Sequence, residues 1–181
     1  MRTILVAALG AFLTLTAFAV EVGKPSPAFT IQRLSGPALQ LSQYKGKVVA
    51  LAFISTTCPH CQNLTKLLNV ISKEYASKGV QVVACAFNDN VKGLLPEFLQ
   101  TVQPTFPVGY CERDAVMAYL QASVVKAFYV PHMVFLDRSG VVKGDFAGES
   151  DFMTQQEMNI RTELDQLLHG ATTTSAAARK Q

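Results

Sequence analysis

The chain has 181 residues, 49% of them hydrophobic, and a formal net charge of +3 at pH 7. That length and apolar content suit one domain with a sizeable core. The sequence has no basic run and no interleaving of basic with aromatic residues, so it does not indicate a nucleic-acid partner.

Residues 1–19 have the pattern of a secretory signal peptide. A short basic start precedes an apolar stretch, and the small residues of Ala17-Phe18-Ala19 are typical of a cleavage site. We expect cleavage after Ala19 and an exported protein, periplasmic or otherwise extracytoplasmic. The alternative is an uncleaved membrane anchor, although the apolar run is short for a membrane span.

Residues 20–170 are expected to form one domain of the α/β class, and residues 171–181 a disordered tail. Near the start of the domain, two short apolar segments flank the turn signal Ser35-Gly36-Pro37 and predict a hairpin. Residues 48–54 then form an unbroken apolar run, which is typical of a strand buried on both faces.

Directly after this strand, two cysteines separated by two residues open an amphipathic helical pattern. A helix start presents unpaired N–H groups and partial positive charge, which favour a thiolate, and Pro59 suits the first helical position. We therefore expect Cys58 to be an exposed nucleophile and Cys61, one turn further on, a shielded resolving thiol. His60 would stabilise the Cys58 thiolate further when it is protonated or donates a hydrogen bond.

The other two cysteines bear on alternative interpretations of this motif. A zinc site is disfavoured because Cys85 and Cys111 form no second close pair, and a purely structural disulfide within the motif would be strained and labile. Cys85 itself is predicted to be a small buried hydrophobe in a strand over residues 80–87. A Cys85–Cys111 disulfide remains the less favoured alternative.

The rest of the chain continues the alternation of strands and helices. The strand at residues 48–54, the helix after it and the strand at 80–87 predict a right-handed parallel crossover. The further expected elements are a helix near residues 91–102 with Pro96 starting or kinking it, a strand at 106–108, a helix at 114–123, a hairpin from 133–137 and 141–143, and a helix at 152–168.

Three passages resemble the thioredoxin superfamily, specifically its exported TlpA/ResA-like (AhpC/TSA-related) branch: residues 46–49, the Cys58–Cys61 motif and residues 130–137. The resemblance runs from about Val22 to about Leu168. It implies a thioredoxin fold, with a central mixed β-sheet flanked by helices and an N-terminal β-hairpin extension. The dipeptide Pro59-His60 looks like that of DsbA-type oxidases.

The resemblance also implies a substrate-binding segment at Val130, Pro131 and His132. Members of this superfamily carry a cis-proline there, packed against the dithiol, and an X–Pro bond is the kind that adopts the cis form at low cost. The backbone edge beside it pairs with the substrate peptide. His132 would either tune Cys58 and meet the substrate, or be an outward-pointing strand residue.

Two departures from the family pattern concern proton transfer and the active-site surface. The common tryptophan before the first cysteine is Thr57 here. The buried acid that thioredoxins and DsbA keep six residues before that cysteine is Ala52. The usual proton acceptor for Cys61 is therefore missing, and either solvent or a group elsewhere, such as Glu149, must serve.

Together these features predict an exported thiol–disulfide oxidoreductase that exchanges disulfides with protein substrates as a monomer, without cofactor or metal. The direction of electron flow stays open. Pro59-His60 favours an oxidant, because a stabilised thiolate makes the disulfide easier to reduce. The resemblance to the TlpA/ResA-like branch favours a reductant fed by a membrane redox partner. The stretch from Asn88 to Pro131 is too short for the large helical insertion of DsbA. We therefore slightly favour a reductant.

Two other functions remain as alternatives. A peroxiredoxin-like thiol peroxidase would use Cys58, but Leu51 and Ser55 occupy the positions where that family has proline and threonine. A Sco-like copper-handling protein would bind the metal through both thiols and a histidine. Those proteins usually space their cysteines one residue wider.

Overall fold

A computed structural model describes residues 20–122 and 127–178, and side chains as far as residue 170. The signal peptide or anchor predicted for residues 1–19 lies outside the described residues. Within the described part of the chain, none of the helices is long and apolar enough to cross a membrane.

The core of the molecule is a five-stranded mixed sheet in the order β5-β4-β3-β6-β7. Its central strand β3 pairs in parallel with β4 and antiparallel with β6. All residues of β3 are buried, as the unbroken apolar run predicts. The strands are β3 (Val48–Ile54), β4 (Val80–Ala86), β5 (Val108–Tyr110), β6 (His132–Leu136) and β7 (Val142–Phe146).

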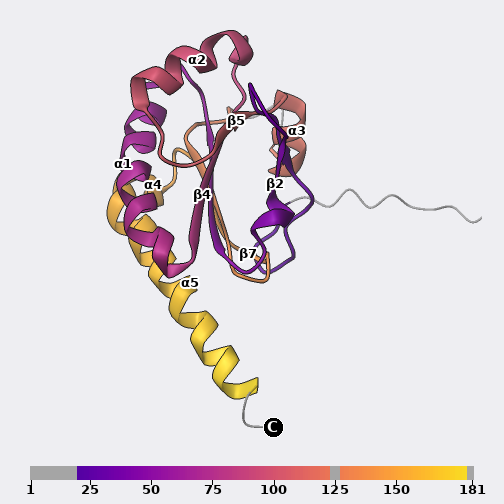
Figure 1. The fold of residues 1–181 in the computed structure, drawn as a ribbon, viewed down its shortest axis with the longest axis vertical. Coiled ribbons are helices and arrows are strands. Elements are labelled where there is room, and N and C mark those ends of the chain that lie inside the picture. The colour runs from indigo at the N-terminus through magenta and orange to yellow at the C-terminus, as the bar shows by residue number, and fades with distance from the viewer. Residues whose placement is uncertain (1–19, 123–126, 179–181) are drawn as a thin grey trace, which may run out of the picture.

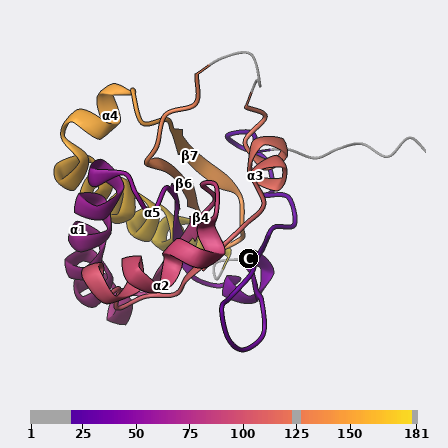
Figure 2. The same cartoon turned by 90° about the horizontal axis from the view of Figure 1, so that it is seen from above.

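Helices cover one face of the sheet, and a smaller layer covers the other (Figures 1 and 2). On the first face lie α1 (Pro59–Tyr75), α2 (Val91–Val102), α4 (Asp151–Thr154) and α5 (Gln156–Ala178). On the second lie α3 (Arg113–Tyr119) and the antiparallel pair β1 (Thr30–Ile31) and β2 (Leu39–Gln40). Short 3₁₀ turns occupy Leu41–Tyr44 and Ala76–Lys78. The expected mixed sheet, flanking helices and N-terminal strand pair are therefore confirmed.

Several boundaries differ from the sequence prediction, and two of the differences have a clear physical reason. Strand β5 begins at Val108 rather than at residue 106, because Pro107 has no N–H and only its carbonyl pairs with β4, at Ala84. Helix α5 continues through residues 171–178, which the sequence analysis assigned to a disordered tail. The segment has no large apolar residue, but it is rich in alanine, which has the highest intrinsic helix propensity.

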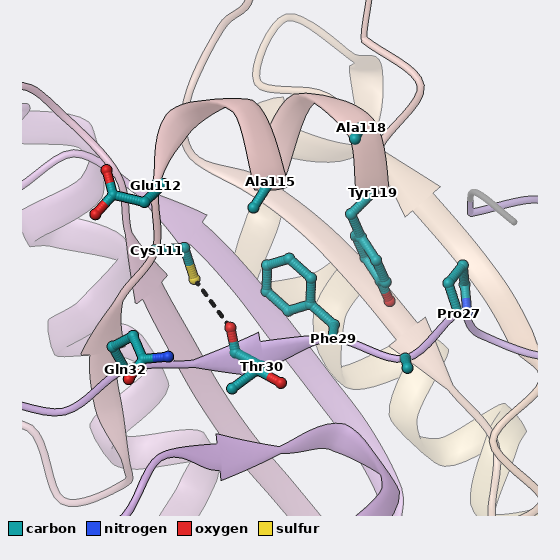
Figure 3. A pocket seen from close by; sticks show the side chains of 10 residues that line it. Pro27, Phe29, Thr30, Gln32, Cys111, Glu112, Ala115, Ala118 and Tyr119 are labelled. Carbon is teal, nitrogen blue, oxygen red and sulfur yellow. Dashed lines mark hydrogen bonds between the residues drawn. The ribbon is translucent and has the colours of Figure 1, made fainter. Parts of the chain in front are cut away.

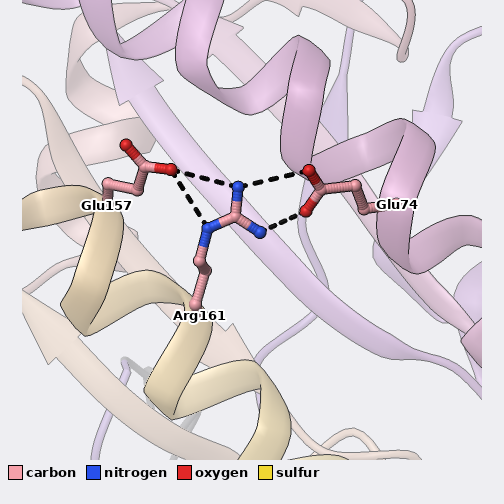
Figure 4. Close-up of polar contacts among 3 residues, drawn as sticks. All are labelled: Glu74, Glu157 and Arg161. Atoms are coloured by element: carbon pink, nitrogen blue, oxygen red, sulfur yellow. Dashed lines mark hydrogen bonds and ion pairs between the residues drawn. The ribbon is translucent and has the colours of Figure 1, made fainter.

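An ion-pair network joins the last helix to the first (Figure 4). Arg161 of α5 donates hydrogen bonds both to Glu157, one turn earlier, and to Glu74 of α1. The hydrogen bond from Arg161 lowers the pKa of Glu74. Ile160 and Leu164 of α5 are fully buried, so apolar packing holds this helix and the partly exposed ion pairs add a smaller contribution.

The main correction to the sequence prediction is a disulfide between Cys85 and Cys111, with Cα atoms 6.2 Å apart. Cys85 is the penultimate residue of β4 and pairs with Gly109 of β5. Since β5 ends at Tyr110, Cys111 follows directly and reaches the neighbouring strand. The later start of β5 is what brings the two cysteines together.

We expect this disulfide to stabilise the fold because the cross-link lowers the conformational entropy of the unfolded chain. It closes a sequence separation of 26 residues, which by loop-closure entropy corresponds to about 3.5 kcal/mol. Replacing both Cys85 and Cys111 by alanine should lower the free energy of unfolding by about that amount, measured by urea denaturation under oxidising conditions.

The matched control is the same pair of substitutions measured in dithiothreitol. There the parent chain has also lost the disulfide, so the difference between the two proteins should shrink to the packing contribution of the sulfur atoms. A difference of the same size under both conditions would show that packing, and not the cross-link, accounts for the stability.

Candidate active site

Both cysteines of the motif are free thiols at the start of α1. Cys58 is the N-cap residue, with φ −82° and ψ 119°, and Pro59 is the first residue of the helix. Cys58 is partly exposed, whereas Cys61 is fully buried and packs among the apolar residues under α1. Pro59 and His60 are exposed in the first turn. The arrangement presents one thiol to solvent and shields the other.

Burial dominates the electrostatics of Cys61. Loss of solvent raises the pKa of this thiol far above its ordinary value, and the nearby Cys58 raises it further. The backbone N–H of Ser55 donates to the Cys61 sulfur at 3.3 Å and offsets part of this effect. At neutral pH Cys61 is therefore a protonated thiol that must lose its proton before it can attack.

No carboxylate in the described residues contributes to the pKa of Cys61. Ala52, at the position of the family's buried acid, is fully buried within β3 and carries no ionisable group. Glu149, the alternative named from the sequence, is exposed in the loop after β7. Position 52 therefore supplies no proton acceptor to Cys61.

The segment before β6 approaches the exposed thiol. The Cys58 sulfur lies 3.9 Å from the carbonyl oxygen of Val130, and the Val130–Pro131 peptide bond is cis. Gly148 packs closely against this segment: a Cβ atom there would lie 3.0 Å from the Tyr129 carbonyl carbon and 3.1 Å from the Pro131 oxygen. Val130 and Pro131 therefore lie beside the dithiol, and the loop after β7, which contains Gly148, packs against them.

A polar anchor holds the turn that precedes Cys58, and the sequence analysis missed it. Asn88 Oδ1 accepts hydrogen bonds from the backbone N–H of Thr56 at 2.8 Å and from its hydroxyl at 3.1 Å. Gln62 in the first turn of α1 donates to the Thr56 carbonyl oxygen. The available signal was the position of Asn88 directly after a strand parallel to β3, because the carboxyl ends of such strands meet at one edge.

His132 does not lie at the active-site surface, which corrects both expectations for it. It is 6% exposed, so it does not point into solvent. Its ring packs edge-on against Phe53 and flat against Phe128, on the sheet face opposite the dithiol. The reason is register: successive residues of a strand point to opposite faces, and Met133 takes the face of α1.

The second face also contains a cavity of about 430 Å³ between β1 and α3 (Figure 3). Phe29 and Tyr119 form its apolar walls, and the disulfide-bonded Cys111 lies at its other end, 3.8 Å from the carbonyl oxygen of Thr30. None of its lining residues belongs to the dithiol motif.

Among the described residues no cluster of His, Cys, Asp and Glu could hold a metal ion.

A dithiol at a helix start, directly after the central strand of such a sheet, defines the thiol–disulfide oxidoreductases of thioredoxin fold. Comparison with known families agrees: residues 21–164 match the model of the Redoxin family, so the chain belongs to that family.

Relatives and solved structures narrow this assignment. The chain is 30% identical over 148 residues to the thioredoxin-like protein YneN of Bacillus subtilis, covering 81% of each protein. It is 28% identical to the thiol-disulfide oxidoreductase ResA of Geobacillus kaustophilus, over 90% of this chain and 93% of that one. A thiol:disulfide interchange protein of the thioredoxin family from Chlorobium tepidum has the same fold, with a TM-score of 0.64 at 22% identity over 81% of this chain and 99% of that one. The protein is a TlpA/ResA-like thiol–disulfide oxidoreductase.

The missing proton acceptor predicts the pH dependence of the resolving step. With Cys58 held as a mixed disulfide with thionitrobenzoate, release of that thiol should accelerate roughly tenfold for each pH unit between about pH 6 and pH 8, because the thiolate fraction of Cys61 rises with pH and does not saturate there. Glu149→Gln should leave the profile unchanged, and Ala52→Asp should raise the rate at low pH. A rate for the parent protein that levels off below pH 7 would show that a nearby base serves Cys61.

Proposed function

We propose that the protein is an exported oxidoreductase that exchanges disulfides with protein substrates through Cys58 and Cys61. The observation that carries this proposal is the pairing of a partly exposed Cys58 at the N-cap with a fully buried Cys61 one turn later. Only the Cys58 thiol is accessible to a macromolecule. Cys61 is placed to attack Cys58 within the same chain and so release a substrate bound there as a mixed disulfide.

The exchange proceeds in two balanced steps. The Cys58 thiolate attacks one sulfur of a substrate disulfide, forms a mixed disulfide and releases the other sulfur as a thiolate. The deprotonated Cys61 then attacks the Cys58 sulfur, expels the second substrate thiolate and leaves a Cys58–Cys61 disulfide. The substrate gains two electrons, and the protein loses them.

The peptide edge beside Cys58 is the proposed contact for the substrate chain. The carbonyl of Val130 points to the reacting sulfur at 3.9 Å, so a peptide hydrogen-bonded along this edge would bring its own sulfur close to Cys58. Thr56 and Thr57 on the other side open onto a groove of about 280 Å³ that α2 completes. A substrate could therefore lie across the dithiol between these two features.

Export is supported by two features of the chain. The sequence of residues 1–19 has the pattern of a signal peptide. The Cys85–Cys111 disulfide is of the kind that persists in oxidising compartments and is rare in reducing ones. We further propose that the protein acts as a monomeric reductant, resupplied with electrons by a membrane partner, because it resembles the TlpA/ResA-like branch over nearly the whole predicted mature chain.

Trapping the mixed disulfide tests the proposed exchange. Cys61→Ser should accumulate a covalent complex with a disulfide-containing peptide, because the second step has lost its nucleophile, and mass spectrometry should locate the bond on Cys58. Cys58→Ser is the matched control and should form no complex. Equal trapping by both variants would contradict the assignment of the two roles.

The role of His60 is tested by the reduction potential. If His60 stabilises the Cys58 thiolate, its removal destabilises the reduced form, so His60→Ala should make the potential of the Cys58–Cys61 couple more negative by about 30 mV, equivalent to a tenfold change in the exchange equilibrium. Equilibration in graded glutathione buffers measures this. An unchanged potential would assign His60 to the exposed surface alone.

A further inference from the structure

The segment beside the dithiol is an arch whose base is closed on the far face of the sheet. We use the name arch for residues 129–131, which carry the Val130 carbonyl toward Cys58. The residues at its two ends meet: the rings of Phe128 and His132 stack with centroids 5.4 Å apart and an angle of 6° between their planes. Closing both ends on one stack limits the positions that the arch can take.

A carboxylate on the neighbouring strand fixes the imidazole in this stack. Asp145 of β7 lies 2.5 Å from His132 Nε2. Because a carboxylate oxygen accepts hydrogen bonds, Nε2 carries the proton and donates. The other ring nitrogen, Nδ1, is buried and has no hydrogen-bond partner among the described residues. The orientation of the ring thus depends on one hydrogen bond and on the flat contact with Phe128.

Other aromatic rings complete the support. Phe128 also makes an edge contact with Phe87 at the end of β4, with centroids 5.8 Å apart, and His132 makes one with Phe53 of β3 at 6.4 Å. The base of the arch is thereby tied to the two strands that also position the dithiol and the Asn88 anchor. A shift of the stack would move the arch relative to Cys58.

We propose that Phe128, His132 and Asp145 are positioning residues that fix the arch and so set the affinity for peptide substrates. None of the three touches either thiol: they act through the backbone of residues 129–131. A binding edge held in place beforehand loses less conformational freedom when a peptide pairs with it. This inference rests on the proposed function, since it concerns the substrate edge of the same site.

The consequence is a separation between two kinds of substrate. A peptide disulfide needs the arch, whereas a small dithiol such as dithiothreitol reacts at Cys58 without a peptide backbone to pair. Disturbing the base should therefore raise KM for the peptide and leave kcat, the reaction with dithiothreitol and the reduction potential unchanged. A general loss of structure would impair all four together.

Asp145→Ala tests the inference most directly. It should raise KM for a peptide disulfide about tenfold, since a small displacement of a positioning group has large effects, with kcat and the dithiothreitol rate unchanged. Asp145→Asn keeps a hydrogen-bond acceptor for Nε2 and should return KM to nearly the parent value. Phe128→Leu, which removes the stack but no charge, should raise KM in the same way.

The matched control is Val142→Ala. Val142 lies on the same strand as Asp145, is fully buried on the same face of the sheet and pairs with Leu136, at the opposite end of β6 from His132. Its truncation should lower stability without moving the stack. A rise in KM for Val142→Ala equal to that for Asp145→Ala, or an unchanged KM for Asp145→Ala, would overturn the inference. A parent protein that reacts with dithiothreitol but with no peptide would overturn the proposed function itself.

Discussion

The burial of β3 on both faces is the constraint on which the rest of the structure depends. Its residues are at most 2% exposed, and neighbouring strands pair with it on both sides. The end of this strand therefore cannot move, and the turn that follows it starts from a fixed point. Helix α1 packs back onto the neighbouring strand β4 and shares one apolar cluster with β3, which places Cys61 inside the core and leaves Cys58 at the rim. Hydrophobic burial thus determines which thiol is accessible.

The two faces of the sheet carry different groups that bear on the site. The face under α1 and α5 holds the dithiol, and the face under α3 and the N-terminal strand pair holds the Cys85–Cys111 disulfide and His132. Val130 packs against both apolar clusters. The segment that approaches Cys58 is therefore the point where the two layers meet, and the packing of the far layer bears on chemistry in the near one.

Local patterns in the sequence predicted the parts of the site that depend on one segment. The apolar run and the dithiol after it are contiguous, so strand, N-cap and shielded thiol could be derived together. The disulfide depended on where β5 begins, and a difference of two residues decided whether Cys111 could reach Cys85. The face chosen by His132 depended on strand register, which reverses with a shift of one residue. Such details arise from pairing between distant segments and leave no local signal.

The burial of Cys61 bears on the rates of exchange more than on its equilibrium. An ordinary cysteine thiol, with a pKa of about 8.5, is already mostly protonated at pH 7, so raising the pKa of Cys61 changes the energy of the reduced state little. It does lower the fraction of thiolate, and without a nearby base the second step slows. A slow second step lengthens the life of the mixed disulfide. In the proposed function, the peptide edge at Val130 would hold the substrate during that time together with the covalent bond, so the lack of an acid at Ala52 and a fixed arch would both favour capture of the peptide.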